Sequence, residues 1–197
     1  MEVEGRPEHE QIIQWFRTLP LWLDLGGLRV IHACWDPPMI DLLAPQLLPG
    51  QRLSDQVLER SSRRRSPEYD AIGNLLKGPE VRLPGGITFR DKDGIQRDHV
   101  RIRWWDTSTR TYRQAAIVGS EEQRDAIPDL PLPDSPGPIT AVTQPTIFGH
   151  YWMSGTPAVL SPLHACVDFS IARGGPLVAY RWKGEEQLTS QHLVWCD

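Results

Sequence analysis

Two short apolar segments each end in a histidine, and these histidines are the clearest candidates for chemistry in the sequence. The segments read RVIHACWD, which contains His32, and PTIFGHYW, which contains His150. In open α/β architectures, ligands gather at the ends of strands, where the backbone turns away and side chains converge. A neutral histidine at such a position can bind a metal ion through a ring nitrogen. The alternative is that each is a hydrogen-bonded structural residue, and the residues alone leave both interpretations open.

Three charged residues could act beside the histidines. The segment HVRIRWW alternates in polarity, which predicts that Arg101 and Arg103 share one face of a strand. An arginine fork suits the oxygens of a phosphate group, although a solvated strand face also explains the pair. Asp168 lies in the apolar segment CVDFS, where an unpaired carboxylate is costly. It is predicted either to orient a metal-bound histidine or to cap a nearby turn.

The elements that would position these residues form a mixed α/β pattern. Apolar residues in 8–17 recur at helical spacing, and Pro20 ends that helix. A strand, a reversal at Gly26–Gly27 and a second strand, LRVIHA, lead to His32. Residues 38–80 are predicted to be helical, with Ser54 and Ser66 as N-caps.

The second half of the sequence is predicted to be mainly β-structure. A hairpin is expected around Asp93–Gly94, followed by the alternating strand, in which Val100, Ile102 and Trp104 face one way. Residues 121–138 are rich in Pro, Asp and Glu and are predicted to form a loop. The remainder is expected to be a series of short strands: TAVTQPTIFGH, HACVDFSIA, PLVAYRWKG and LTSQHLVWC.

Composition limits the class of protein. The 197 residues suffice for one domain, and the net charge of −4 with a pI near 5.9 argues against nucleic acid as a partner. The sequence has no apolar run of membrane-spanning length and no targeting segment, so no membrane partner is expected. Three cysteines without a CxxC pair argue against a disulfide framework. Together these features predict a cytoplasmic protein.

Larger segments of the sequence resemble a known family. WFRTLPLWLDLGGLRVIHACWD, then TIFGHYW, then ACVDFSIARGGPLVAYRWKGE are similar, in order, to the C-terminal half of calcineurin-like metallophosphoesterases. These include the serine/threonine protein phosphatases and the symmetrical dinucleoside-tetraphosphatases. The resemblance implies a β-sandwich flanked by helices. It also implies that residues 38–135 form a helical and β-type insertion, or cap, within a single domain of residues 1–197.

The resemblance also implies a site. His32 would be the family's isolated metal-binding histidine, and His150 would be the histidine of its GH motif. The site would hold two divalent ions of manganese, iron or zinc. Arg101 or Arg103 would contact the phosphate of a phosphoprotein or nucleotide substrate. The family's GDxHG, GDxxDRG and GNH(E/D) motifs do not occur in this sequence.

Three hypotheses follow. The first is a metal-dependent phosphoesterase of which this chain is the C-terminal part, inactive alone because a two-metal site needs several oxygen ligands. The second is a non-catalytic interaction module, or one subunit of a split protein that needs a partner chain. The third is a mononuclear zinc hydrolase in which His164 or Asp168 completes the site. If the other half is missing, the chain is expected to expose an apolar face or strand edge where that half would pack, since tryptophans are numerous. The expected consequence is self-association, or a marginal fold that the missing half restores.

Overall fold

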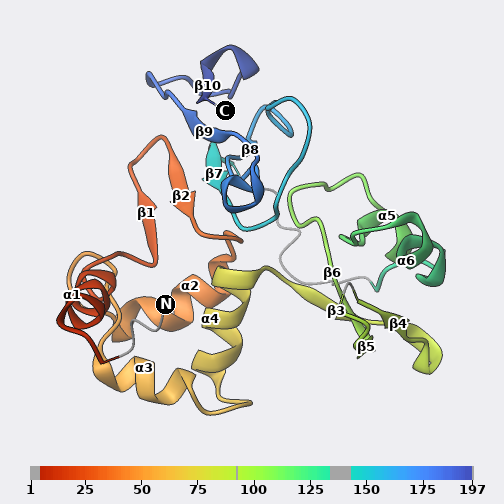
Figure 1. The fold of residues 1–197 in the computed structure, drawn as a ribbon, viewed down its shortest axis with the longest axis horizontal. Helices are drawn as coiled ribbons and strands as arrows, with labels where there is room; N and C mark the ends of the chain where they lie inside the picture. The colour runs from red at the N-terminus through yellow and green to blue at the C-terminus, as the bar shows by residue number, and fades with distance from the viewer. Residues whose placement is uncertain (1–4, 92, 134–142, 197) are drawn as a thin grey trace.

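The computed structural model describes residues 5–91, 93–133 and 143–196 and has a mixed α/β fold, as the sequence predicts (Figure 1). The α-helices are α1 (Pro7–Phe16), α2 (Pro37–Leu43), α3 (Asp55–Ser61), α4 (Pro67–Lys77), α5 (Tyr112–Ala115) and α6 (Glu121–Ala126). The strands are β1 (Trp22–Asp24), β2 (Arg29–Ile31), β3 (Glu80–Arg82), β4 (Phe89–Arg90), β5 (Gln96–Arg97), β6 (His99–Arg101), β7 (Thr146–Phe148), β8 (His164–Cys166), β9 (Leu177–Tyr180) and β10 (Leu193–Cys196). Short 3-10 helices cover Ala44–Gln46, Pro84–Gly86, Ile171–Arg173 and Ser190–His192.

A four-stranded sheet brings the two halves of the chain together. Its strand order is β1-β2-β7-β8, in which β1 and β2 form the predicted antiparallel hairpin and β2, β7 and β8 are parallel. The carboxyl ends of three consecutive parallel strands therefore meet at one edge. The other strands pair two by two, as β3 with β6, β4 with β5 and β9 with β10. Within the described residues, the two facing sheets of a sandwich are not shown.

Helices α2, α3 and α4 lie below this sheet and share its main core (Figure 1). The buried residues come from the sheet (Ile31, Phe148, Cys166), from the helices (Leu43, Val57, Leu75) and from the segment after β6 (Trp104). The helix starts agree with the sequence, because the side chains of Ser54 and Ser66 accept hydrogen bonds from the backbone of α3 and α4.

A second, smaller core lies within residues 38–135, the predicted insertion. Val81, Val100, Ile102 and Ile127 are buried there. The predicted hairpin is confirmed, with Gly94 at a φ of +75° in the turn between β4 and β5. The loop predicted for residues 121–138 is wrong for its first part, because Glu121–Ala126 form α6. Residues 134–142, which include the end of that loop and the start of TAVTQPTIFGH, lie outside the described residues.

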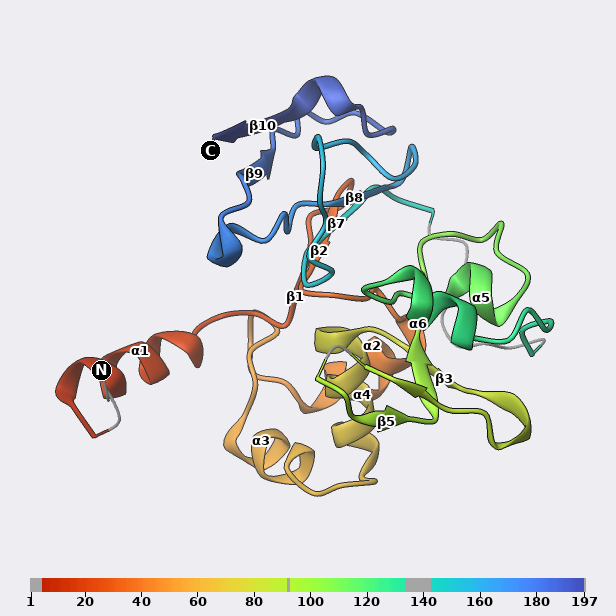
Figure 2. The same cartoon turned by 45° about the vertical axis from the view of Figure 1, so that its right-hand side comes forward.

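Helix α1 differs from the others in having no buried residue. It extends away from the rest of the chain (Figure 2). Its C-terminal end is held by an ion pair between Arg17 and Asp55 and by the pairing of Pro20 with Arg52. None of the helices in the described ranges is long and apolar enough to cross a bilayer.

Candidate functional site

The two candidate histidines lie side by side at the carboxyl edge of the four-stranded sheet. His32 follows β2 directly, and His150 comes two residues after β7, the strand that pairs with β2 in parallel. Their ring centroids are 5.2 Å apart, with an angle of 57° between the ring planes. The expectation that the two side chains lie within reach of each other, at the ends of neighbouring strands, is therefore confirmed.

The strand before His32 ends because the backbone that follows it forms hydrogen bonds with a helix instead of with the sheet. The amides of Ala33 and Cys34 both donate to the carbonyl of Leu75 in α4, at 3.1 and 3.2 Å. Asp36 then accepts from the amide of Met39 and starts α2. This change of partner turns the chain from the sheet to the helical layer and leaves the side chain of His32 exposed at the sheet edge.

The segment that carries His150 has unusual backbone geometry. The amide of Gly149 donates to the carbonyl of His32 at 2.9 Å, so the pairing of β2 and β7 continues to the histidines. His150 itself has a φ of +74°, in the left-handed region that a non-glycine residue adopts only at a cost. Such strain is characteristic of functional positions.

This backbone strain gives a stability prediction. His150→Gly should be more stable to urea than His150→Ala by about 1 kcal/mol, because glycine adopts a positive φ without the Cβ clash that alanine keeps. Both variants lose the same imidazole, so the comparison isolates the backbone. Equal midpoints in urea unfolding followed by circular dichroism would contradict the strain at this position.

Arg101 is the arginine that reaches the histidines. One terminal nitrogen, Nη1, lies 3.4 Å from Nε2 of His150, and the other, Nη2, donates to Oε1 of Glu80 at 3.0 Å. Its Nε is buried and has no hydrogen-bond partner among the described residues. Arg103, the other candidate, lies elsewhere: its amide donates to the carbonyl of Ala115, and its side chain lines a different cavity.

Glu80 was not among the residues singled out in the sequence. It is the direct cross-strand partner of Arg101 in the β3–β6 pair, and it fixes the direction of the guanidinium. The usable signal is the register of these two strands: once Val81 is placed opposite Val100, Glu80 must face Arg101.

Asp168 completes the edge from the third parallel strand. It follows β8 by two residues, and its Oδ1 accepts the amide of Ser170 at 3.0 Å, which is the turn-capping role considered in the sequence. It also lines a shallow hollow of about 260 Å³ together with His32 and His150. Apolar residues, among them Val30, Ile147 and Val167, make up much of the rest of its lining.

The electrostatic setting keeps His150 neutral. The pKa of His150 is lowered to about 4, chiefly by burial and then by the neighbouring Arg101 and His32, against the attraction of Asp168. At neutral pH the imidazole is therefore neutral, which is the form that binds metal ions, and its Nε2 faces the guanidinium of Arg101. Arg101 and the exposed Lys77 make the surroundings favourable for an anion.

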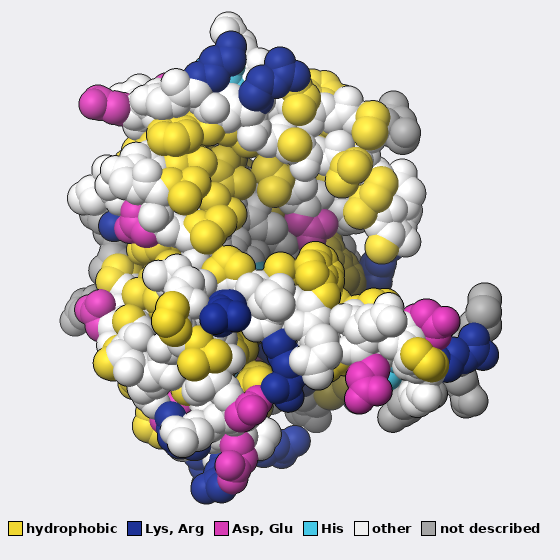
Figure 3. All heavy atoms as spheres, turned by 90° about the vertical axis from the view of Figure 1, so that its left-hand side faces the viewer, with side chains coloured by type: hydrophobic (Ala, Val, Ile, Leu, Met, Phe, Trp, Pro, Cys, Tyr) yellow, Lys and Arg dark blue, Asp and Glu magenta, His cyan; other side chains and the backbone are white. Residues whose placement is uncertain are grey.

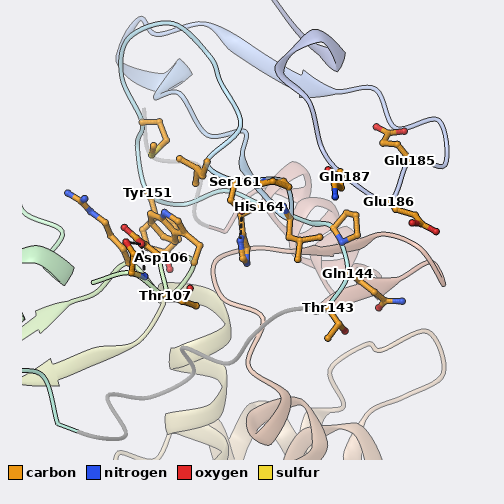
Figure 4. Close-up of a pocket in the computed structure, with 18 of the residues that line it drawn as sticks. Asp106, Thr107, Thr143, Gln144, Tyr151, Ser161, His164, Glu185, Glu186 and Gln187 are labelled. Carbon is orange, nitrogen blue, oxygen red and sulfur yellow. Dashed lines mark hydrogen bonds between the residues drawn. The ribbon is translucent and has the colours of Figure 1, made fainter. Parts of the chain in front are cut away.

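His164 lies at the other end of the sheet. It begins β8 and pairs with Thr146, the first residue of β7, whereas His150 follows the end of β7. The three-ligand zinc site completed by His164 is therefore wrong. His164 instead lines a separate cavity of about 1330 Å³, and Figure 4 shows it joined to Ser161 by a hydrogen bond of 2.9 Å.

No family model, curated protein or solved structure matches this chain. Within the described ranges, no three His, Cys, Asp or Glu side chains lie together as a ready-made metal centre. The site is thus a pair of imidazoles, one arginine and one carboxylate gathered at one sheet edge.

Proposed function

We propose that this chain contributes part of the active site of a metal-dependent phosphoesterase of the calcineurin-like type. The observation that carries the proposal is the placement of His32 and His150, whose rings are 5.2 Å apart at adjacent strand ends, with Arg101 next to His150. This is the arrangement that the family resemblance implies. The substrate class is a phosphate ester, of a protein or a nucleotide.

The donor set fits one divalent ion. Two imidazole ligands suit zinc, iron or manganese, and the remaining coordination positions stay open. A divalent ion supplies positive charge that polarises a phosphoryl group. The second metal of the family needs several oxygen ligands, and among the described residues that line the hollow beside the histidines Asp168 is the single carboxylate. We therefore propose that His32 and His150 hold an ion here and that Asp168 orients His150.

Arg101 is proposed to bind the phosphate group. Its Nε is buried without a partner, and an unsatisfied buried donor costs free energy that an anion would recover. Glu80 holds the guanidinium in place, so that binding costs little side-chain entropy.

The three free cysteines, two of them buried, fit the reducing compartment that the sequence predicts.

Metal binding tests the histidine pair. Titration of the chain with Mn²⁺, followed by paramagnetic broadening of histidine resonances, should broaden His32 and His150 first. Each of the variants His32→Ala and His150→Ala should weaken Mn²⁺ binding at least tenfold, a loss of about 1.4 kcal/mol. His99→Ala removes an exposed histidine from β6 and serves as the matched control. Broadening that follows His99 instead would contradict the proposal.

Arg101 and Arg103 form a second matched pair. With Mn²⁺ present, Arg101→Ala should weaken the binding of inorganic phosphate, whereas Arg103→Ala should leave it unchanged, because only Arg101 reaches His150.

Hydrolysis of p-nitrophenyl phosphate by this chain should stay far below the roughly one turnover per second typical of enzymes, since the acidic ligands are missing. Turnover at that rate, abolished by His150→Ala, would show that two histidines suffice.

The interaction module is the second candidate function, and the helix α1 favours it. Four large apolar side chains of α1 are between 40% and 57% exposed, namely Ile12, Ile13, Trp15 and Phe16. A helix of ten residues has little stability of its own in water, so a partner is expected to cover this face.

A further inference from the structure

Two apolar surfaces of this chain lack a covering partner within the described residues, and they lie far apart. The first is the α1 stripe, which we define as Ile12, Ile13, Trp15 and Phe16. The second is the outer face of the β9–β10 hairpin, defined as Leu177, Ala179, Val194 and Cys196. In both ribbon views α1 lies at the lower left and the hairpin at the top, so they do not meet within one chain (Figures 1 and 2).

The outer hairpin face follows from the strand register. Leu177 pairs with Cys196, and Ala179 pairs with Val194, so these four side chains project from the same face. Their neighbours Val178 and Leu193 point inward and are buried against Phe169. On the outer face, Leu177 is 58% exposed and Val194 is 36% exposed. Figure 3 shows hydrophobic side chains gathered over the upper half of the face that lies on the left in Figure 1.

We propose that α1 of one copy of this chain packs its stripe on the outer hairpin face of a second copy, and that the contact is reciprocal. This inference is independent of the proposed metal site. A helix lying on a two-stranded sheet is a standard way to bury an amphipathic helix. The ion pair between Arg17 and Asp55 and the pairing of Pro20 with Arg52 fix the end of α1, so the helix is presented as an arm rather than folded back.

The two surfaces match in length and in charge. The ten residues of α1 span about 15 Å. The hairpin face from Leu177 to Arg181 spans about 13 Å. Glu8 lies one turn before Ile12 on the stripe, and Arg181 continues the outer face two residues after Ala179, with its amide paired to His192. Each surface therefore ends in one charge, and the two charges are opposite.

The area is sufficient for a specific dimer. A half-exposed aromatic side chain has roughly 100 Å² left to bury. The two surfaces of each copy comprise eight side chains, of which Trp15 and Phe16 are aromatic and the others are smaller. Over the two reciprocal contacts, their exposed area approaches the roughly 1,200 Å² at the lower limit of stable interfaces. A reciprocal contact doubles the area of a single one, which is why two copies suit these surfaces.

Oligomeric state tests the proposal directly. Size-exclusion chromatography with light scattering on the full chain should show a monomer–dimer equilibrium in the micromolar range. Trp15→Glu on the stripe and Val194→Glu on the hairpin face should each raise the dimer dissociation constant at least tenfold. Gln14→Glu adds the same charge to the opposite face of α1 and should leave it unchanged. Circular dichroism confirms that each variant keeps its fold, since all three positions are exposed.

Two further variants identify the pair of surfaces. Glu8→Arg and Arg181→Glu should each weaken the dimer, and the double variant should restore it. Cys196 is the exposed thiol of the three cysteines, so a short bis-maleimide should link Ile12→Cys of one copy to Cys196 of the other and yield a covalent dimer. A monomer at about 100 µM, where a micromolar dimer must form, would overturn the proposal. Dimers that tolerate both Trp15→Glu and Val194→Glu would overturn it as well.

Discussion

Trp104→Ala should destabilise the fold by about 3–5 kcal/mol, the largest effect expected of any single change in this chain. The indole is completely buried and lies where the sheet, the helical layer and the β6 segment meet. Its ring packs against Phe148, Trp105 and His164 at centroid distances of 4.9, 6.0 and 5.3 Å. Its Nε1 also donates to the carbonyl of Ala33 at 2.9 Å, the residue after His32.

Removal of this side chain leaves both a cavity and an unpaired carbonyl. Because small domains are stable by only about 5–15 kcal/mol, Trp104→Ala should bring the chain close to unfolding at room temperature. Trp104→Phe fills most of the space but loses the hydrogen bond, so about 1–2 kcal/mol is expected. Trp152→Ala removes a half-exposed indole stacked by Arg173, and the loss should stay near 1 kcal/mol or below. Urea unfolding measures all three, and equal losses for Trp104→Ala and Trp152→Ala would contradict the packing argument.

Trp104 also shows what the sequence can predict. The alternation of HVRIRWW places Val100, Ile102 and Trp104 on one side, and all three are buried. The same alternation predicts a shared face for Arg101 and Arg103, but β6 ends at Arg101 and Arg103 pairs with the segment at Ala115. The apolar side chains remain buried although the backbone changes its pairing partner after Arg101, because the core continues on that side. The direction of a polar side chain does change with the backbone pairing. The alternating pattern alone therefore cannot tell which arginine, Arg101 or Arg103, lies next to the histidines.

The histidine pair was predictable for a physical reason. The short apolar segments rich in β-branched residues predict two strands, and each histidine comes directly after its segment. Neighbouring parallel strands end at the same edge of a sheet. His32 and His150 therefore had to lie close together once β2 and β7 paired. The left-handed backbone at His150 was not predictable, because no residue type marks it. It depends on the contacts that hold the chain after Gly149.

Helix α6 was missed although a local signal exists. Ser120 begins the sequence SEEQ, and its side chain accepts a hydrogen bond from the amide of Gln123, as in a capping box. Glu121 and Glu122 add favourable charge to the first turn. The prolines that follow dominate the composition of this region and led to the prediction of a loop. For a helix of only six residues, the capping motif at Ser120 is therefore a better guide than the composition of the surrounding region.

Stability should fall as the pH is lowered from 6.5 to 4, and His164 should account for a large part of the loss. Burial lowers the pKa of His164 to about 4 from an ordinary value of 6.5. Its Nδ1 is paired with Ser161, and its Nε2 is buried without a partner among the described residues. A proton added to this ring therefore has no acceptor in the fold. Protonation is easier in the unfolded chain, so acid favours unfolding.

The sign and size follow from linkage. Above pH 6.5 both states carry a neutral imidazole and the full contribution of His164 is present, whereas below that pH the unfolded chain binds the proton first. The contribution is lost progressively until the pH reaches about 4, and it amounts to at most about 3 kcal/mol. His164→Gln should flatten the dependence of the unfolding free energy on pH across this window. His99→Gln, at an exposed histidine, should keep the dependence of the parent chain. Urea unfolding between pH 4.5 and 7 measures the slopes, and equal slopes for the parent chain and His164→Gln would show that His164 is not held neutral.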